Sequence, residues 1–186
     1  HICEAANTGL SLASGDLIAR LDSDDRWKPE KLEKQVQYMQ AHPECGACLT
    51  LVEFFGPEHI DFPMQGELFQ VENKTQEEWL QQLYFHRNFF CHSSSIYRKS
   101  LLNQGYNLAL CMLHDYDLWV QLLKKAPIYI FQEPLTLYFW DNRSNASSQT
   151  DEHTEQLYYE SSYLRSHFFD DMDDDLFRRT FQPWFQ

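Results

Sequence analysis

The chain of 186 residues has the length of one domain of ordinary size, and its 43% of hydrophobic residues is enough to bury a core. Its 28 acidic and 15 basic residues give a formal net charge of −13. This charge argues against binding to the phosphate backbone of nucleic acid and against direct attraction to an anionic membrane surface. A phosphorylated ligand would need a metal ion to bridge it to so acidic a protein.

No apolar run approaches the roughly 20 residues that span a bilayer, and no signal peptide is visible, so we expect a cytoplasmic protein. The chain begins with His1 rather than with methionine, and its first residues already belong to a structural element, so we expect a segment upstream of it. Five cysteines without a signal peptide do not indicate a disulfide framework. Cys45 and Cys48 form a CxxC pair, to which Cys91 and His92 could add two zinc ligands. Buried structural thiols are the favoured interpretation of these cysteines.

The first predicted element is a short helix within residues 1–15, because small residues recur there and a glycine closes the segment. Residues 16–21 form an apolar run that is typical of a buried strand. A cluster of carboxylates follows this strand directly and consists of Asp22, Asp24 and Asp25.

A helical pattern begins at Pro29, and Leu32, Val36 and Met39 have the spacing of one buried face. The next strand is expected at 45–55. The second half of the chain continues the alternation of helices and strands, and its helix at 115–125 carries an apolar stripe. The elements expected there are a loop at 56–74, a helix opened by the capping box of Thr75 and Glu78, a strand at 93–97, a short helix at 98–104, a helix at 115–125 and a β-rich segment at 128–140 with a bend or edge at Pro134.

The alternation of strands and helices indicates an α/β fold with a largely parallel sheet. Ligands of such sheets bind beyond the carboxyl ends of the strands, where the aspartate cluster is expected to lie. Residues 151–186 are predicted to be helical and contain nine carboxylates against three arginines. A solvated helical tail is favoured over a specific docking surface for this segment.

Asp22 and Asp24 lie two residues apart in an extended segment, so their side chains point to the same side and can converge on one ligand. Carboxylates that repel one another are most commonly held together for a divalent cation. The alternative is a turn with helix-capping aspartates, because a DxD pattern is common by chance.

At this point the sequence resembles the family 2 glycosyltransferases. The first matching block is ANTGL at 6–10, ASGDLIARLDSDD at 13–25 and WKPEKL at 27–32. A second block is HSSSIYRK at 92–99, and a third is HDYDLW at 114–119, where His114 stands in place of the usual glutamate. Together the blocks span roughly residues 5–140.

The resemblance implies a GT-A fold, which is the Rossmann-like α/β fold of nucleotide-diphospho-sugar transferases, here lacking its first strands. Relatives begin with strands that hold the nucleotide base and part of the ribose, and neither strand is present. The implied organisation is a partial catalytic domain at 1–150, with a donor and metal part at 1–55 and an acceptor part at 75–140. The acidic helical tail at 151–186 follows it.

The implied reaction moves a sugar from a nucleotide-sugar donor to the hydroxyl of a saccharide, lipid-linked or protein acceptor, with inversion. Asp22, Asp24 and Asp25 would bind the donor: Asp24 would hold the Mg²⁺ or Mn²⁺ ion that bridges its diphosphate, Asp22 would lie close by, toward the ribose or the metal, and Asp25 would lie behind them. Asp115 would be the general base that takes the proton of the acceptor hydroxyl. A plain acid in the first turn of the helix is the alternative for Asp115. A lipid-linked acceptor would bring the protein to the membrane surface peripherally.

On the acceptor side, His92, His114 and Trp119 could contact the acceptor, and Arg143 could contact the diphosphate. A structural histidine and a core tryptophan are the alternatives for His92 and Trp119. Asp117 is interpreted as a first-turn acid.

Two other classes of function are compatible with the residues. One is a non-catalytic α/β module that binds carbohydrate or a protein through aromatic side chains, which make up 16% of the chain. The other is a metal-dependent hydrolase that uses the same carboxylates and breaks down the donor without an acceptor.

Overall fold

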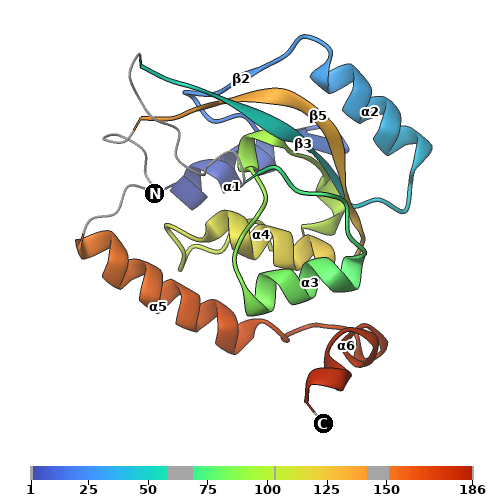
Figure 1. Ribbon diagram of the computed structural model, residues 1–186, viewed down its shortest axis with the longest axis vertical. Coiled ribbons are helices and arrows are strands. Elements are labelled where there is room, and N and C mark those ends of the chain that lie inside the picture. The colour runs from blue at the N-terminus through green and yellow to red at the C-terminus, as the bar shows by residue number, and fades with distance from the viewer. Residues whose placement is uncertain (1, 58–68, 103, 142–150, 186) are drawn as a thin grey trace.

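A five-stranded sheet with helices on both faces forms the centre of the computed structural model, which describes residues 2–57, 69–102, 104–141 and 151–185 (Figure 1). The strands are β1 (Leu17–Ala19), β2 (Arg26–Trp27), β3 (Ala47–Phe55), β4 (Ile96–Arg98) and β5 (Ile128–Phe139). The helices are α1 (Ile2–Leu12), α2 (Lys31–Ala41), α3 (Gln76–Phe85), α4 (His114–Leu123), α5 (Asp151–His167) and α6 (Asp174–Phe181), with 3₁₀ turns at His92–Ser94, Lys99–Leu101 and Gln182–Trp184.

The strand order is β1-β4-β3-β5-β2, and the pairing differs from the largely parallel sheet that we expected. Only β3 and β5 pair in parallel, whereas β1 with β4, β4 with β3, and β5 with β2 are antiparallel. The prediction was wrong because the short strand β4 runs in the opposite direction between β1 and β3. The α/β class itself is confirmed.

Strand β1 is the edge strand of the sheet among the described residues, and this explains why it is less buried than expected. Leu17 and Ile18 are half-buried, and Ala19 is exposed. The two-residue strand β2 at the opposite edge was not expected at all, because it is too short to show a pattern in the sequence.

The pairing of β3 with β5 is irregular at the predicted bend. The register shifts on both sides of Leu51, which lies opposite Pro134, a residue that cannot donate to the ladder. Across the irregularity, the side chains of Thr50 on β3 and Thr136 on β5 share a hydrogen bond of 2.9 Å. This shift carries the end of β5 beside β2 and therefore next to the loop that holds the aspartate cluster.

Helix α2 covers one face of the sheet, and α3 and α4 cover the other, with α5 and α6 beyond them (Figure 1). The buried face of α2 is formed by Lys31, Gln35 and Met39, whereas Leu32 is 40% exposed. The predicted face of α2 is therefore wrong at Leu32, although Met39 is buried as expected. Val36 is partly buried and packs against the cluster of buried residues that Met39 forms with Cys45, Cys48 and Ile96.

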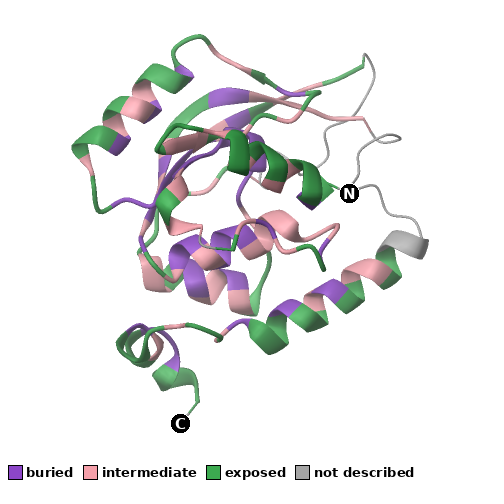
Figure 2. Ribbon diagram, turned by 180° about the vertical axis from the view of Figure 1, so that it is seen from behind, coloured by how far each residue is buried: buried purple, intermediate pink, exposed green. Residues whose placement is uncertain are grey.

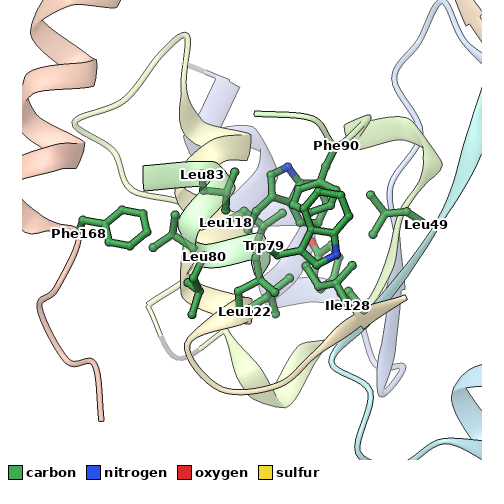
Figure 3. Packing of buried hydrophobic residues seen from close by; sticks show 14 of the residues in the cluster. Leu49, Trp79, Leu80, Leu83, Phe90, Leu118, Leu122, Ile128 and Phe168 are labelled. Carbon is green, nitrogen blue, oxygen red and sulfur yellow. The ribbon is translucent and has the colours of Figure 1, made fainter. Parts of the chain in front are cut away.

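Two tryptophans and a phenylalanine lie at the centre of the larger core (Figure 3). The ring of Phe90 lies 4.7 Å from that of Trp79 on α3 and 5.5 Å from that of Trp119 on α4. The predicted apolar stripe of α4 is confirmed, and its members Leu118, Trp119, Leu122 and Leu123 are all buried.

The C-terminal helices pack against this core rather than extending into solvent. Phe168, Leu176 and Phe181 belong to the same buried cluster as Trp79, and Leu164 on α5 is buried as well. Figure 2 shows buried positions alternating with exposed ones along α5. The interpretation of 151–186 as a solvated tail is therefore wrong, because Leu164, Phe168, Leu176 and Phe181 face inward.

The predicted capping box at the start of α3 is confirmed. The backbone N–H of Glu78 donates to Thr75 Oγ1 over 3.2 Å, and the N–H of Thr75 donates to Glu78 Oε2 over 2.8 Å. Among the described residues, no helix is long and apolar enough to cross a membrane.

Thr75→Ala is expected to lower the free energy of unfolding by about 1 kcal/mol, because it removes the acceptor for one backbone N–H at the helix start. Urea unfolding measures this change. Thr8→Ala is the control, since the Thr8 hydroxyl donates only to a carbonyl of its own helix, and it should change stability by less than about 0.5 kcal/mol. Equal losses in both variants would contradict the role of the cap.

Candidate active site

Residues 22–25, which we call the carboxylate loop, connect β1 to β2. Asp22 accepts hydrogen bonds at Oδ1 from Arg20 Nη2 (2.6 Å) and Arg20 Nε (2.9 Å), and its own N–H donates to Ser93 Oγ over 3.0 Å. Burial opposes the ionisation of Asp22, but the Arg20 guanidinium and these hydrogen bonds hold its pKa below the usual value. Asp22 is therefore a carboxylate at neutral pH.

The other two carboxylates of the loop have contrasting surroundings. Asp24 is exposed and forms no hydrogen bond or ion pair with any described residue. Asp25 is only 8% exposed, and its Oδ1 accepts from the N–H of Phe139 at the end of β5 over 2.8 Å. Its Oδ2 is buried without a partner among the described residues, and burial raises the pKa of Asp25 to about 6.

The 3₁₀ turn His92–Ser94 supports the carboxylate loop. Ser93 is fully buried; its side chain accepts from Asp22, and its carbonyl accepts from Trp27 Nε1 over 2.7 Å. Hydrogen bonds to this turn, which lies about 70 residues further along the chain, thus hold both ends of the loop region. The sequence of the loop could not indicate this distant partner.

Asp115 lies in the first turn of α4, as predicted. Its Oδ1 accepts from the N–H of Tyr116 and its Oδ2 accepts from Asn88 Nδ2, both over 2.8 Å. Burial raises the pKa of Asp115, and the negative charge of Asp22 acts in the same direction, while His114 opposes it. The structure therefore brings Asp115 within electrostatic range of the carboxylate loop. Asn88 was missed, because no pattern in the sequence distinguishes it.

His92 lies beneath the surface in the same region. Its Nε2 shares a hydrogen bond of 2.9 Å with the hydroxyl of Tyr106, and its ring centroid is 5.6 Å from that of His114. Burial and the charge of Arg20 lower the pKa of His92 to about 3, against the opposing effect of Asp22, so the ring is neutral at physiological pH. His92 is 8% exposed, which fits the alternative of a structural histidine.

The remaining predicted site residues have different outcomes. Trp119 has no exposed surface and packs in the core, which fits the interpretation as a core tryptophan and not the one as an acceptor contact. His114 is half-buried, and its Nδ1 lies 3.0 Å from the carbonyl oxygen of Cys111. Asp117 Oδ2 accepts from Gln121 Nε2 over 2.7 Å and, with Gln121, lines a cavity of about 720 Å³ that Asp115 does not line. Arg143 lies outside the described residues.

The carboxylate loop has the donor chemistry that Mg²⁺ and Mn²⁺ require. Asp22 and Asp24 offer hard carboxylate oxygens, and Asp25 Oδ2 is a buried oxygen without a partner among the described residues. Within the described part of the chain, no group of three or more such side chains could enclose a metal ion. The loop therefore fits an ion that takes one or two carboxylates from the protein and its other ligands from phosphate and water.

The favoured interpretation of the CxxC pair is confirmed. Cys45 and Cys48 are free and buried, and each thiol donates to a backbone carbonyl, of Ala47 over 3.0 Å and of Gln35 over 3.8 Å. Burial raises the pKa of both thiols, which keeps them protonated and unsuited to metal binding at neutral pH.

The sequence and the fold were compared with known proteins. The family model of glycosyl transferase family 2 matches residues 2–105, which is more than half of the chain. The amylovoran biosynthesis glycosyltransferase AmsE of Erwinia amylovora is 29% identical over 121 residues, which cover 64% of this chain and 43% of AmsE. The O-antigen biosynthesis glycosyltransferase WbnJ of Escherichia coli is 26% identical over 125 residues, 66% of this chain and 46% of WbnJ.

Among solved structures, residues 1–349 of S. aureus TarS in complex with UDP-GlcNAc match with a TM-score of 0.62 and 17% identity, covering 90% of this chain and 46% of the other. At this identity the match shows the fold, which is the expected GT-A fold. The chain spans about half the length of the curated relatives that it matches. Since the family model and the fold agree, the chain belongs to glycosyl transferase family 2.

Proposed function

We propose that the protein transfers a sugar from a nucleotide-sugar donor to an acceptor hydroxyl, with inversion at the anomeric carbon and with the help of a divalent cation. The observation that carries this proposal is the contact between the two parts of the site: Ser93 accepts from the N–H of Asp22, and the ring of the adjacent His92 lies 5.6 Å from that of His114, the neighbour of Asp115. A base for the acceptor and a carboxylate loop for the donor are the two parts that such a reaction needs.

In the proposed reaction the acceptor oxygen forms a bond to the anomeric carbon as the bond to the diphosphate breaks. Asp115 accepts the proton of the acceptor hydroxyl. Its raised pKa suits this role, because a carboxylate with a higher pKa is a stronger base. The hydrogen bonds from Asn88 and from the backbone of Tyr116 fix the direction of the carboxylate.

Asp24 and Asp22 are the residues that would hold the cation on the donor side, and the cation would neutralise the charge of the diphosphate leaving group. Asp24 is accessible for this role, and Asp22 is fixed by Arg20 through one oxygen only. Asp25 ties the loop to the end of β5 and so keeps the two other carboxylates in place.

The names of the matched proteins suggest where to look for substrates. TarS was crystallised with UDP-GlcNAc, and AmsE and WbnJ are named for the biosynthesis of amylovoran and O-antigen. A uridine diphosphate sugar is therefore the first donor to test, and a growing bacterial polysaccharide is the acceptor class that we propose.

Titration calorimetry of UDP against the natural protein, with and without Mn²⁺, tests the donor side. Mn²⁺ should raise the affinity for UDP by at least about tenfold, and Asp24→Ala should abolish this increase. Asp16→Ala is the control, because Asp16 is an exposed carboxylate just before β1, and it should keep the metal dependence.

Binding of UDP that is independent of metal in all three proteins would contradict the proposal. Hydrolysis of the donor without an acceptor would favour the hydrolase alternative. Saccharide binding that survives both EDTA and Asp115→Asn, without any transfer, would favour the non-catalytic module.

A further inference from the structure

Glu160 on α5 is a buried carboxylate that the proposed reaction does not use directly. It is only 6% exposed, and its two oxygens accept hydrogen bonds from three consecutive backbone N–H groups. Oε1 accepts from Cys111 over 2.8 Å, and Oε2 accepts from Met112 over 2.9 Å and from Leu113 over 2.8 Å. Gln156 Nε2 adds a fourth hydrogen bond of 2.9 Å to Oε1 and so orients the carboxylate.

These three residues form the turn that leads into α4. Leu113 is the N-cap residue of α4, and its apolar side chain provides no cap hydrogen bond. The N–H groups at a helix start need acceptors from outside the helix, and a negative charge there is also favoured by the helix dipole. Glu160 therefore satisfies the N–H groups of the N-cap residue Leu113 and of the two residues before it, and it places a carboxylate at the start of α4, although it lies 47 positions further along the chain.

The turn that Glu160 holds is directly continuous with the candidate base. His114 and Asp115 are the first two residues of α4, and His114 Nδ1 lies 3.0 Å from the carbonyl oxygen of Cys111 within the turn. The direction of the Asp115 side chain follows from the backbone of this first turn. Asn88 donates to Oδ2 of Asp115 and the N–H of Tyr116 donates to Oδ1, so both carboxylate oxygens are held.

We propose that Glu160 is a positioning residue for sugar transfer, which acts by fixing the turn 111–113 and through it the direction of Asp115. This inference rests on the proposed function of Asp115 as the base. It makes helix α5 part of the structure that positions the candidate base. It also explains why a carboxylate is buried on a helix whose other described carboxylate, Glu155, is exposed.

Glu160→Gln tests the proposal, because it keeps the size of the side chain but replaces one acceptor oxygen by a donor. In the Glu160→Gln variant, kcat for sugar transfer should fall about 10- to 100-fold relative to the unmodified protein, since a misplaced base slows the reaction to that extent. The dissociation constant of UDP with Mn²⁺ should change by less than about twofold.

Glu160→Asp, which keeps the charge on a shorter side chain, should restore part of kcat. Glu155→Gln is the matched control on the same helix and should leave kcat unchanged.

Hydrogen exchange of the amides of 111–113 provides a readout that does not depend on activity. Exchange should be at least about tenfold faster in Glu160→Gln than in the unmodified protein and in Glu155→Gln. Faster exchange with an unchanged kcat would overturn the positioning role while leaving the proposed function intact. Absence of transfer by the unmodified protein with any donor would instead refute the proposed function.

If Glu160→Gln unfolds the protein, the same measurements on Glu160→Asp test the positioning role. A Glu160→Asp protein with faster exchange at 111–113, a lower kcat and unchanged UDP affinity supports the positioning role. Equal reductions of kcat and of UDP affinity would overturn it, because they would indicate a general loss of structure.

Discussion

Asp115→Asn is expected to lower kcat for sugar transfer by about 10²- to 10⁴-fold, which is the range that a positioned general base contributes. The amide cannot take the proton of the acceptor hydroxyl, but its oxygen can still accept from the backbone N–H of Tyr116. Affinity for the donor should stay within about twofold, because Asp115 lies on α4 and the donor is assigned to the carboxylate loop.

The pH dependence of kcat gives a second measurement on the same variant. A base acts when it is ionised, so the rate should rise as the pH passes through the pKa of Asp115, which burial raises above the usual value for an aspartate. In Asp115→Asn the remaining rate should lose this rise. The assignment of the base fails if the variant keeps both the rate and the rise.

Asp117→Asn is the matched control for this experiment. Asp117 lies on the same helix, and burial raises its pKa as well, but its carboxylate accepts from Gln121 and faces a different cavity. Its replacement should change kcat by less than about threefold, far below the loss expected of a general base. A loss as large as that of Asp115→Asn would indicate that the first turn of α4 is sensitive to any change of charge.

Local patterns in the sequence predicted the parts of the fold that depend on near neighbours. The capping box of Thr75 and Glu78 and the apolar stripe of α4 involve residues three or four apart, and both are present. The carboxylate loop was predicted at the end of a strand because Asp22 follows an apolar run directly. The direction of strand pairing was not predictable, since β4 pairs with strands about 50 and 80 residues earlier.

The anchors of the candidate site escaped prediction for the same reason. Asn88 contacts Asp115 across 27 positions, Phe139 contacts Asp25 across 114, and Glu160 reaches Leu113 across 47. The resemblance proposes Asp25 and Asp115 as candidate site residues, but their partners depend on how the sheet and the C-terminal helices are arranged.

Helix α2 shows that an apolar pattern can also mislead. Lys31 and Gln35 appear in the sequence as solvent-facing residues, yet both have no exposed surface. Lys31 Nζ donates to Gln35 Oε1 over 2.7 Å and lies 4.2 Å from the ring centre of Trp27. Gln35 Nε2 in turn donates to the carbonyls of Cys48 and Ser94, both over 2.9 Å, so the polar groups satisfy one another inside the protein.

This buried amine should make stability depend on pH in an unusual range. Lys31 forms no ion pair with any described residue, and burial lowers its pKa from the usual value of 10.5 to about 8. Between these two values the unfolded chain holds a proton that the folded chain has released. The contribution of Lys31 to stability is therefore largest above pH 10.5 and is lost as the pH falls through 8, a change of about 3 kcal/mol.

Lys31→Met should remove this dependence, because methionine keeps an unbranched apolar stem of similar length and carries no titrating group. Urea unfolding at pH 7.5, 9 and 10.5 measures the difference between the two proteins, which cancels the titration of tyrosines and thiols common to both. The variant should gain stability relative to the unmodified protein at pH 7.5, although Gln35 loses a donor, and the advantage should shrink by about 3 kcal/mol at pH 10.5.

Lys34→Met on the same helix is the control: Lys34 is partly exposed and pairs with Glu133, so its replacement should leave the pH dependence in place. Parallel stability profiles for Lys31→Met and the unmodified protein would show that the buried amine keeps an ordinary pKa.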